Sequence, residues 1–174
     1  MRRKRPFTGP DDMSGPFSFL VYNTSMPLIQ SDVEMEMFAR ELAVGLHPMA
    51  QAVVLGLNGE LGSGKTFFVK GLAKFYGITD IVSSPTFVLE KIYKLEKKPF
   101  DHLIHIDAYR LEKPEELQAL GWDEIITNSR NLICVEWAER VEKLMPKTTR
   151  YLSFEHINET TRQVSFDAHG KKTY

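Results

Sequence analysis

The chain has 174 residues, of which 43% are hydrophobic and 26% charged, so it is long and apolar enough for one folded domain and is not predicted to be disordered. Its 22 Lys and Arg against 23 Asp and Glu give a net charge of −1, which argues against a protein that binds nucleic acid chiefly through its phosphates. The single cysteine, Cys134, excludes an internal disulfide, and the lack of a long apolar run argues against a membrane span. We expect a soluble, cytoplasmic protein that makes no membrane contact.

The first 16 residues combine four cations at positions 2–5 with a stretch rich in Gly, Pro and Asp. That composition cannot bury a core, so residues 1–16 are predicted to form a mobile tail ahead of a single domain over 17–174. The basic cluster is typical of a solvated tail, and binding to a nucleic acid or a partner protein is the alternative interpretation. No apolar stretch follows the cluster to complete a signal peptide.

Short apolar segments alternate with amphipathic segments along the domain. Strands are predicted over 17–22, 52–57, 86–93, 102–106 and 132–135. Helices are predicted after Ser31, over 65–76, from Pro114 and over 138–144. Near the end, Leu152 and Phe154 are followed by Val164 and Phe166 across a polar turn, which predicts a β-hairpin. These elements predict an α/β domain with a mixed central sheet and a C-terminal hairpin.

The first predicted helix carries signals at both ends. Ser31 stands at the N-cap position and Glu34 follows three residues later, a capping box in which each side chain accepts a hydrogen bond from a backbone N–H. Apolar residues at helical spacing follow, from Met35 to Leu46, and Pro48 prevents the helix from continuing. The apolar stripe of this helix is expected to face the core.

Residues 59–66 match the pattern G-x-x-x-x-G-K-[ST] in full, between a predicted strand and a predicted helix. Glycines allow successive backbone N–H groups to turn inward around phosphate oxygens, and the helix N-terminus that follows favours an anion. Lys65 adds a positive charge for the β- and γ-phosphates, and the Thr66 hydroxyl is a ligand for Mg²⁺. The predicted phosphate-binding residues are Gly59, Glu60, Leu61, Gly62, Ser63, Gly64, Lys65 and Thr66.

A P-loop needs a carboxylate at the end of a neighbouring strand to hold the metal or its water shell. Two predicted strands end in an acid, at Asp107 and at Glu136, and their spacing from the P-loop does not decide between them. His105 lies in the first of these strands, where a structural hydrogen bond and a role near phosphate are both open interpretations. Arg110 lies three residues after Asp107. It is interpreted either as a partner in a salt bridge or as an arginine finger supplied by the same chain.

Four motifs follow one another along the chain: GELGSGKT at 59–66, SPTF at 84–87, HIDAYRL at 105–111 and EW at 136–137. In this order and spacing they resemble the TsaE family (formerly YjeE), and the similarity covers about residues 24–155. The resemblance implies a P-loop NTPase-like three-layer domain that binds and hydrolyses ATP with Mg²⁺. It further implies a role in forming threonylcarbamoyladenosine at position 37 of tRNA together with TsaB and TsaD, with tRNA contacted only indirectly.

The resemblance also assigns roles to residues around the phosphates. Thr66 and Glu136 would hold Mg²⁺. Asp107 would face the γ-phosphate and support hydrolysis, and Thr86 would lie in a switch-like loop. The residues expected to serve catalysis are Asp107, Lys65 and Thr86.

On the nucleoside side, the resemblance implies that Trp137 lines the pocket and that the adenine end lies near Ser31 and Asp32. The sequence departs from the family pattern at three positions: Glu60 stands in place of the usual Asp, Ser63 in place of Ala, and Met35 where the first helix often has Thr. Of these departures, only Met35 touches the predicted adenine side.

Two other functional classes fit part of the sequence. One is a nucleotide-controlled binding module whose hydrolysis is incidental, which would bind nucleotide tightly but turn over little even with its partners. The other is a small-molecule kinase, which would need an acceptor pocket and a lid rich in Arg or Gly. The sequence contains no segment typical of such a lid.

Overall fold

The computed structural model of the chain describes residues 26–79, 82–96 and 98–167. The predicted tail over 1–16 and the predicted strand over 17–22 lie outside the described residues. No helix in the described ranges combines the length and apolarity needed to cross a membrane.

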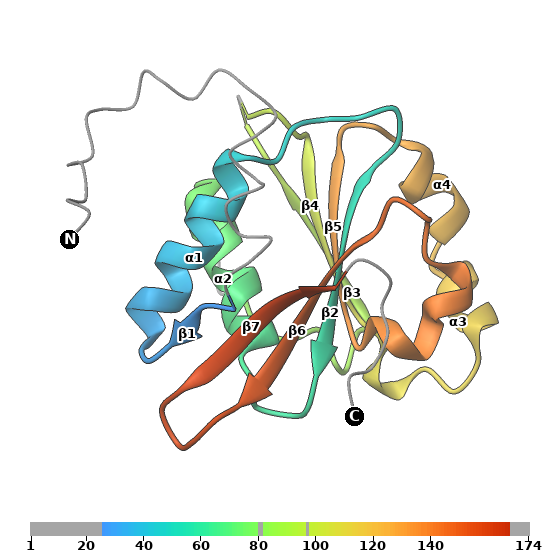
Figure 1. Cartoon of the computed structure of the whole chain (residues 1–174). Coiled ribbons are helices and arrows are strands. Elements are labelled where there is room, and N and C mark those ends of the chain that lie inside the picture. Colours follow the sequence, from blue (N-terminus) through green and yellow to red (C-terminus); the bar gives the residue numbers. More distant parts are fainter. Residues whose placement is uncertain (1–25, 80–81, 97, 168–174) are drawn as a thin grey trace.

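The described residues form a seven-stranded sheet in the order β1-β7-β6-β2-β5-β4-β3 (Figure 1). The strands are β1 (Leu28–Ile29), β2 (Val53–Gly59), β3 (Glu90–Lys94), β4 (His102–Asp107), β5 (Asn131–Glu136), β6 (Arg150–His156) and β7 (Arg162–Asp167). The four central strands β6, β2, β5 and β4 are parallel, whereas β3 and β7 pair antiparallel with their neighbours. The predicted mixed sheet and the C-terminal hairpin, β6 with β7, are therefore confirmed.

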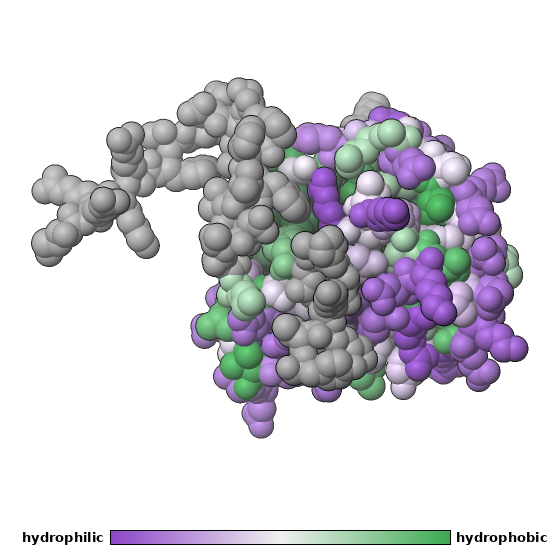
Figure 2. Space-filling model, turned by 45° about the vertical axis from the view of Figure 1, so that its right-hand side comes forward, coloured by the Kyte–Doolittle hydropathy of each residue, from purple (hydrophilic) through white to green (hydrophobic). Residues whose placement is uncertain are grey.

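Helices cover both faces of the sheet, which gives the predicted three layers (Figure 1). The longer pair, α1 (Asp32–Val44) and α2 (Lys65–Phe75), lies on one face and buries Phe38 and Leu72 in the core there. Trp122 is the largest side chain of the core on the other face. That second layer contains η2 (Ala108–Arg110), α3 (Pro114–Ala119), α4 (Trp122–Thr127) and η3 (Ala138–Leu144). Hydrophilic residues dominate the outer surface on this side of the molecule (Figure 2).

The start of α1 agrees with the predicted capping box in one half and differs in the other. The Oγ of Ser31 accepts a hydrogen bond from the backbone N–H of Glu34 at 3.2 Å. The Glu34 carboxylate accepts from the backbone N–H of Gln30 at 2.7 Å, one residue earlier than the box predicts. Both bonds fix the turn between β1 and α1, which lines a cavity described below.

Two predicted elements are corrected by the structure. The strand predicted over 86–93 begins only at Glu90, because the backbone N–H groups of Val88 and Leu89 both bond to the carbonyl of Pro85 and close a turn. The segment 138–144 is a 3₁₀-helix rather than a regular helix, and it is interrupted at Val141, where φ is −120°. The strand β1 and the helix α4 were not predicted, since each is too short for its periodicity to be detected.

The helices α1 and α2 cross closely at Gly71. A Cβ atom at this position would lie 2.7 Å from the Cβ of Ala39 and 3.2 Å from the Cα of Glu36. We therefore expect Gly71→Leu to lower the free energy of unfolding by about 1–3 kcal/mol, because overpacking forces the helices apart even though Leu favours a helix. Urea unfolding measures this loss, with Lys70→Leu on the exposed face of α2 as the control. Equal stability of the two variants would contradict so close a crossing.

Candidate nucleotide-binding site

The candidate site lies at the carboxyl ends of the parallel strands β2, β5 and β4. The register pairs Leu57 with Glu136, and Glu136 in turn with Asp107. The loop after β2 and the acids that end β5 and β4 therefore meet at the same edge of the sheet. This edge is where parallel α/β sheets commonly bind ligands.

The predicted P-loop connects β2 to α2, and its glycines are required by its backbone. Gly59, Gly62 and Gly64 have φ angles of 136°, 76° and 107°, in the region that side-chain-bearing residues rarely adopt. A Cβ at Gly59 would also lie 2.3 Å from the carbonyl oxygen of Phe154 on β6. Gly64 is the N-cap of α2, so the loop leads directly into the N-terminus of this helix.

Of the P-loop side chains before Lys65, two are exposed to solvent and one is buried. Glu60 is exposed, and Leu61 is 78% exposed, which leaves both at the mouth of the site. Ser63 is fully buried, and its hydroxyl has no hydrogen-bond partner among the described residues. Ser63 thus lies beneath the loop, and it would contribute to a phosphate site through its backbone rather than its hydroxyl.

Lys65 is buried within the loop at 4% exposure. Its Nζ donates hydrogen bonds to the carbonyls of Gly59 at 2.6 Å and Glu60 at 2.8 Å. Burial lowers the pKa of Lys65, and the nearby carboxylates, first among them Glu136, oppose that shift. The P-loop cation is therefore held in place before any phosphate arrives.

Trp137 lies over this cation, with Nζ of Lys65 4.2 Å from the ring centre. The ring of Tyr109 packs against Trp137 with 5.0 Å between the ring centres. Trp137 has a positive φ of 59°, and its backbone N–H donates to the carbonyl of Leu57 at 2.9 Å. An aromatic residue held in this strained conformation directly after Glu136 is typical of a functional site.

Glu136 connects the P-loop helix to the strand β4. Its Oε1 accepts a hydrogen bond from the hydroxyl of Thr66 at 2.7 Å and lies 2.8 Å from Nε2 of His105. Glu136 and His105 are both buried, at 3% and 0% exposure. The structure thus joins the two residues predicted at the Mg²⁺ site, and it places His105 against the acid rather than at the phosphates.

Asp107 has a different set of partners. Its Oδ2 accepts hydrogen bonds from the hydroxyls of Ser84 at 2.6 Å and Thr86 at 2.5 Å, and its Oδ1 accepts from the backbone N–H of Tyr109 at 2.9 Å. Asp107 is 2% exposed. The segment predicted to be switch-like is therefore fastened to Asp107, while the P-loop helix is fastened to Glu136. Asp107 and Glu136 therefore differ in their hydrogen-bond partners, although sequence spacing did not distinguish them.

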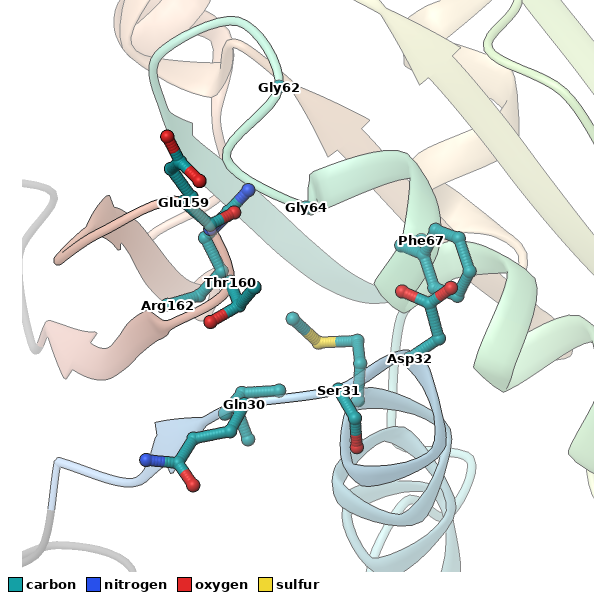
Figure 3. Close-up of a pocket in the computed structure, with 11 residues that line it drawn as sticks. Gln30, Ser31, Asp32, Gly62, Gly64, Phe67, Glu159, Thr160 and Arg162 are labelled. Carbon is teal, nitrogen blue, oxygen red and sulfur yellow. The ribbon is translucent and has the colours of Figure 1, made fainter.

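Two cavities flank the P-loop and share Gly62, Gly64 and Phe67 in their walls. One, of about 300 Å³, is also lined by Leu61, Lys65, Thr66, Ser84, Thr86, Asp107, Tyr109, Glu136 and Trp137. The other, of about 400 Å³, is also lined by Ile29, Gln30, Ser31, Asp32, Met35, Glu159, Thr160 and Arg162 (Figure 3). The two cavities are therefore adjacent, with the P-loop between them.

The second cavity is lined by Asp32 and Met35, together with residues that sequence reasoning did not indicate. The assignment of the adenine end to this side of the P-loop stays a prediction. Glu159, Thr160 and Arg162 come from the hairpin and lie across from Ser31 and Asp32 (Figure 3). The sequence predicts the hairpin itself, but only the pairing of β6 with β2 brings it to the P-loop. Ser84 and Tyr109 lie within the quoted SPTF and HIDAYRL motifs, but the sequence analysis assigned neither of them a role of its own at the site.

Arg110 contacts an aromatic ring in the structure, and its interpretation as an arginine finger stays a prediction. Its guanidinium lies 4.3 Å from the ring centre of Phe87, in the segment that Asp107 holds. Phe87 itself is 84% exposed. This contact connects η2 with the segment before β3 at the rim of the site.

The comparisons with known proteins cover the part of the chain that forms this site. The family described as "Threonylcarbamoyl adenosine biosynthesis protein TsaE" has a sequence model that matches residues 29–164. The chain belongs to the TsaE family. The matched range contains the P-loop and both strand-end acids, so the resemblance seen in the four motifs is confirmed.

TsaE-family relatives support this membership over most of the chain. The tRNA threonylcarbamoyladenosine biosynthesis protein TsaE of Rickettsia bellii is 40% identical over 123 residues, which cover 70% of this chain and 80% of that protein. The protein of the same name from Bacillus subtilis is 39% identical over 119 residues, covering 68% and 72%. The crystal structure of YdiB from the same organism matches with a TM-score of 0.67 at 30% identity, over 84% of this chain and 86% of that one.

Proposed function

We propose that the chain is an ATP-binding and ATP-hydrolysing subunit that acts in the cytoplasm with TsaB and TsaD to form the threonylcarbamoyl group on adenosine 37 of tRNA. The single observation that carries the proposal is the bond between Thr66 and Glu136 across the P-loop, with Asp107 committed separately to Ser84 and Thr86. Family membership supplies the biological setting. The balanced net charge of −1 supports contact with tRNA through partners rather than directly.

In this proposal the nucleotide lies across the P-loop. The backbone N–H groups of the loop and Lys65 bind the phosphates, and the 300 Å³ cavity takes the γ-phosphate end. The 400 Å³ cavity, with Asp32 on its wall, takes the nucleoside. Trp137 covers Lys65 and helps to exclude water from the phosphates.

The residues at Thr66 fit a magnesium ion. Mg²⁺ prefers hard oxygen ligands and usually keeps several waters, and a hydroxyl and a carboxylate 2.7 Å apart supply ligands of this kind. No group of three or more His, Cys, Asp or Glu in the described residues could hold a metal by itself, which suits an ion bound largely through water and phosphate. When bound, Mg²⁺ neutralises charge on the phosphate oxygens. Thr66 and Glu136 would hold it.

Hydrolysis in this proposal depends on Asp107. Its carboxylate faces the cavity that would hold the γ-phosphate, where it can orient an attacking water. Because Asp107 also holds the hydroxyls of Ser84 and Thr86, a change at the γ-phosphate would be transmitted to the segment before β3. That segment is the part of the site that partners would sense.

ATP turnover measured alone and with purified TsaB and TsaD tests the proposal. We expect slow turnover by the isolated chain and a clear rise when both partners are present. Tight nucleotide binding with no turnover under either condition would contradict hydrolysis. That result would instead identify a binding module controlled by nucleotide.

The nucleoside assignment makes its own prediction. We expect Asp32→Ala to weaken ADP binding about two- to tenfold, the effect of losing one hydrogen bond of about 0.5–1.5 kcal/mol, and to leave pyrophosphate binding unchanged. Calorimetric titrations with ADP and with pyrophosphate measure the two affinities. A control is Asp123→Ala, at an exposed position in the first turn of α4. Equal losses for ADP and pyrophosphate would place Asp32 at the phosphates instead.

A further inference from the structure

His105 is a polar side chain in an otherwise apolar part of β4, where it stands between Ile104 and Ile106. It is fully buried. Within the described residues, its Nδ1 has no hydrogen-bond partner, and its Nε2 bonds to Glu136. A buried polar ring costs free energy unless its hydrogen bonds are satisfied, so packing does not explain an imidazole here. The contact with Glu136 explains why a histidine is found at this position.

The bond has a defined direction. An ionised carboxylate only accepts hydrogen bonds, so Nε2 of His105 carries the proton and donates to Oε1 of Glu136. The Thr66 hydroxyl donates to the same oxygen. Oε1 is thus held from two sides, by β4 and by α2, and Oε2 takes part in neither bond.

Without the His105 donor, the side chain of Glu136 is expected to leave its position beside Thr66. The register places Asp107 directly beside Glu136 on the neighbouring strand, and two carboxylates at such a position repel each other. A Glu side chain also has three rotatable bonds, so it samples several directions unless something fixes it. His105 is two residues before Asp107 on the same face of β4, where it fixes Glu136 against Thr66.

We propose that His105 is a positioning residue that presets the Glu136 carboxylate on the Thr66 hydroxyl, so that the two are arranged to bind Mg²⁺ before nucleotide arrives. This inference rests on the proposed function, because it takes Thr66 and Glu136 as the magnesium site. A residue that orients a metal ligand typically changes metal affinity ten- to a hundredfold when it is removed. Affinity for nucleotide without metal is not expected to change.

The test makes two measurements on each variant. The first is ADP affinity by calorimetry in EDTA. The second is the Mg²⁺ concentration at which half of the Mg²⁺-dependent increase in ADP affinity is reached. We expect His105→Leu to raise that Mg²⁺ concentration about ten- to a hundredfold and to change ADP affinity in EDTA by no more than about twofold. His105→Gln keeps an N–H donor at about the reach of Nε2 and should restore magnesium binding to near wild type. His105→Asn carries the same amide one methylene shorter and should behave like His105→Leu.

The matched control is His102→Leu. His102 lies in the same strand, and its Nδ1 is 3.3 Å from the side-chain oxygen of Asn131 on β5, so it makes a similar contact at the other end of the same strand pair. We expect this variant to bind ADP and Mg²⁺ as the wild type does. Thermal unfolding of every variant accompanies the titrations.

Three results would overturn the inference. Equal weakening of ADP binding with and without Mg²⁺ in His105→Leu would show a merely structural role. Similar magnesium affinities in His105→Gln and His105→Asn would do the same, and this pair decides the matter even if His105→Leu does not fold. If Mg²⁺ did not change ADP binding by the wild type, both the inference and the proposed magnesium site would be wrong. The two earlier results would overturn the inference alone, so the two failures can be told apart.

Discussion

Lys65→Ala is expected to weaken ATP and ADP binding about ten- to a hundredfold, because each charge-assisted hydrogen bond to phosphate contributes about 1.5–3 kcal/mol. The geometry supports the upper part of this range. Lys65 is already held by the carbonyls of Gly59 and Glu60 and covered by Trp137, so little ordering remains when phosphate binds. Isothermal calorimetry with ADP measures the loss directly.

The control for this variant is Lys70→Ala. Lys70 is exposed on the same helix and contacts the ring of Phe67, 5.2 Å from its centre. We expect its removal to leave nucleotide affinity unchanged, since it contributes charge but no contact inside the P-loop. Unchanged ADP binding by Lys65→Ala, or equal losses in the two variants, would contradict the phosphate-binding role of the loop.

The two strand-end acids should give opposite results when they are changed separately. Glu136→Ala removes a group from the predicted magnesium site and is expected to weaken MgADP binding about tenfold or more, together with turnover. Asp107→Asn keeps nearly the same shape and is expected to hold MgADP affinity within a few fold. It should lower partner-stimulated turnover about ten- to a thousandfold, because the proposed function assigns Asp107 a role in hydrolysis.

Titration of MgADP into the two variants decides the assignment, because ADP has no γ-phosphate and reports the ground-state site alone. The hydrogen bonds favour Glu136 for the metal, since it bonds to Thr66 while Asp107 bonds to Ser84 and Thr86. If Asp107→Asn lost MgADP affinity while Glu136→Ala kept it, the roles would be reversed.

Much of the fold follows from local sequence signals. The buried strand before the P-loop, the capped helix after Ser31 and the C-terminal hairpin are each encoded within a few consecutive residues, and the structure contains all three. The segment 86–89 could not be predicted in this way. Its apolar residues favour a strand, but the bonds of Thr86 to Asp107, 21 positions along the chain, hold it in a turn.

The same distinction applies to the site. The P-loop is a contiguous motif, so its residues can be read directly from the sequence. Spacing could not decide between Asp107 and Glu136, because the decision depends on which acid Thr66 reaches in space. The contribution of Arg162 to the second cavity depends on strand order, since β6 pairs with β2 and brings the hairpin to the P-loop. Strand order arises from long-range packing, which a single sequence does not display.

The most direct test of the central claim is the level of threonylcarbamoyladenosine in the tRNA of cells depleted of this protein, measured by mass spectrometry of tRNA nucleosides. We expect depletion to remove the modified nucleoside. Re-expression of the wild type or of Lys70→Ala should restore it, and re-expression of Lys65→Ala should not. Full restoration by Lys65→Ala, or an unchanged level after depletion, would contradict the claim that this nucleotide site serves tRNA modification.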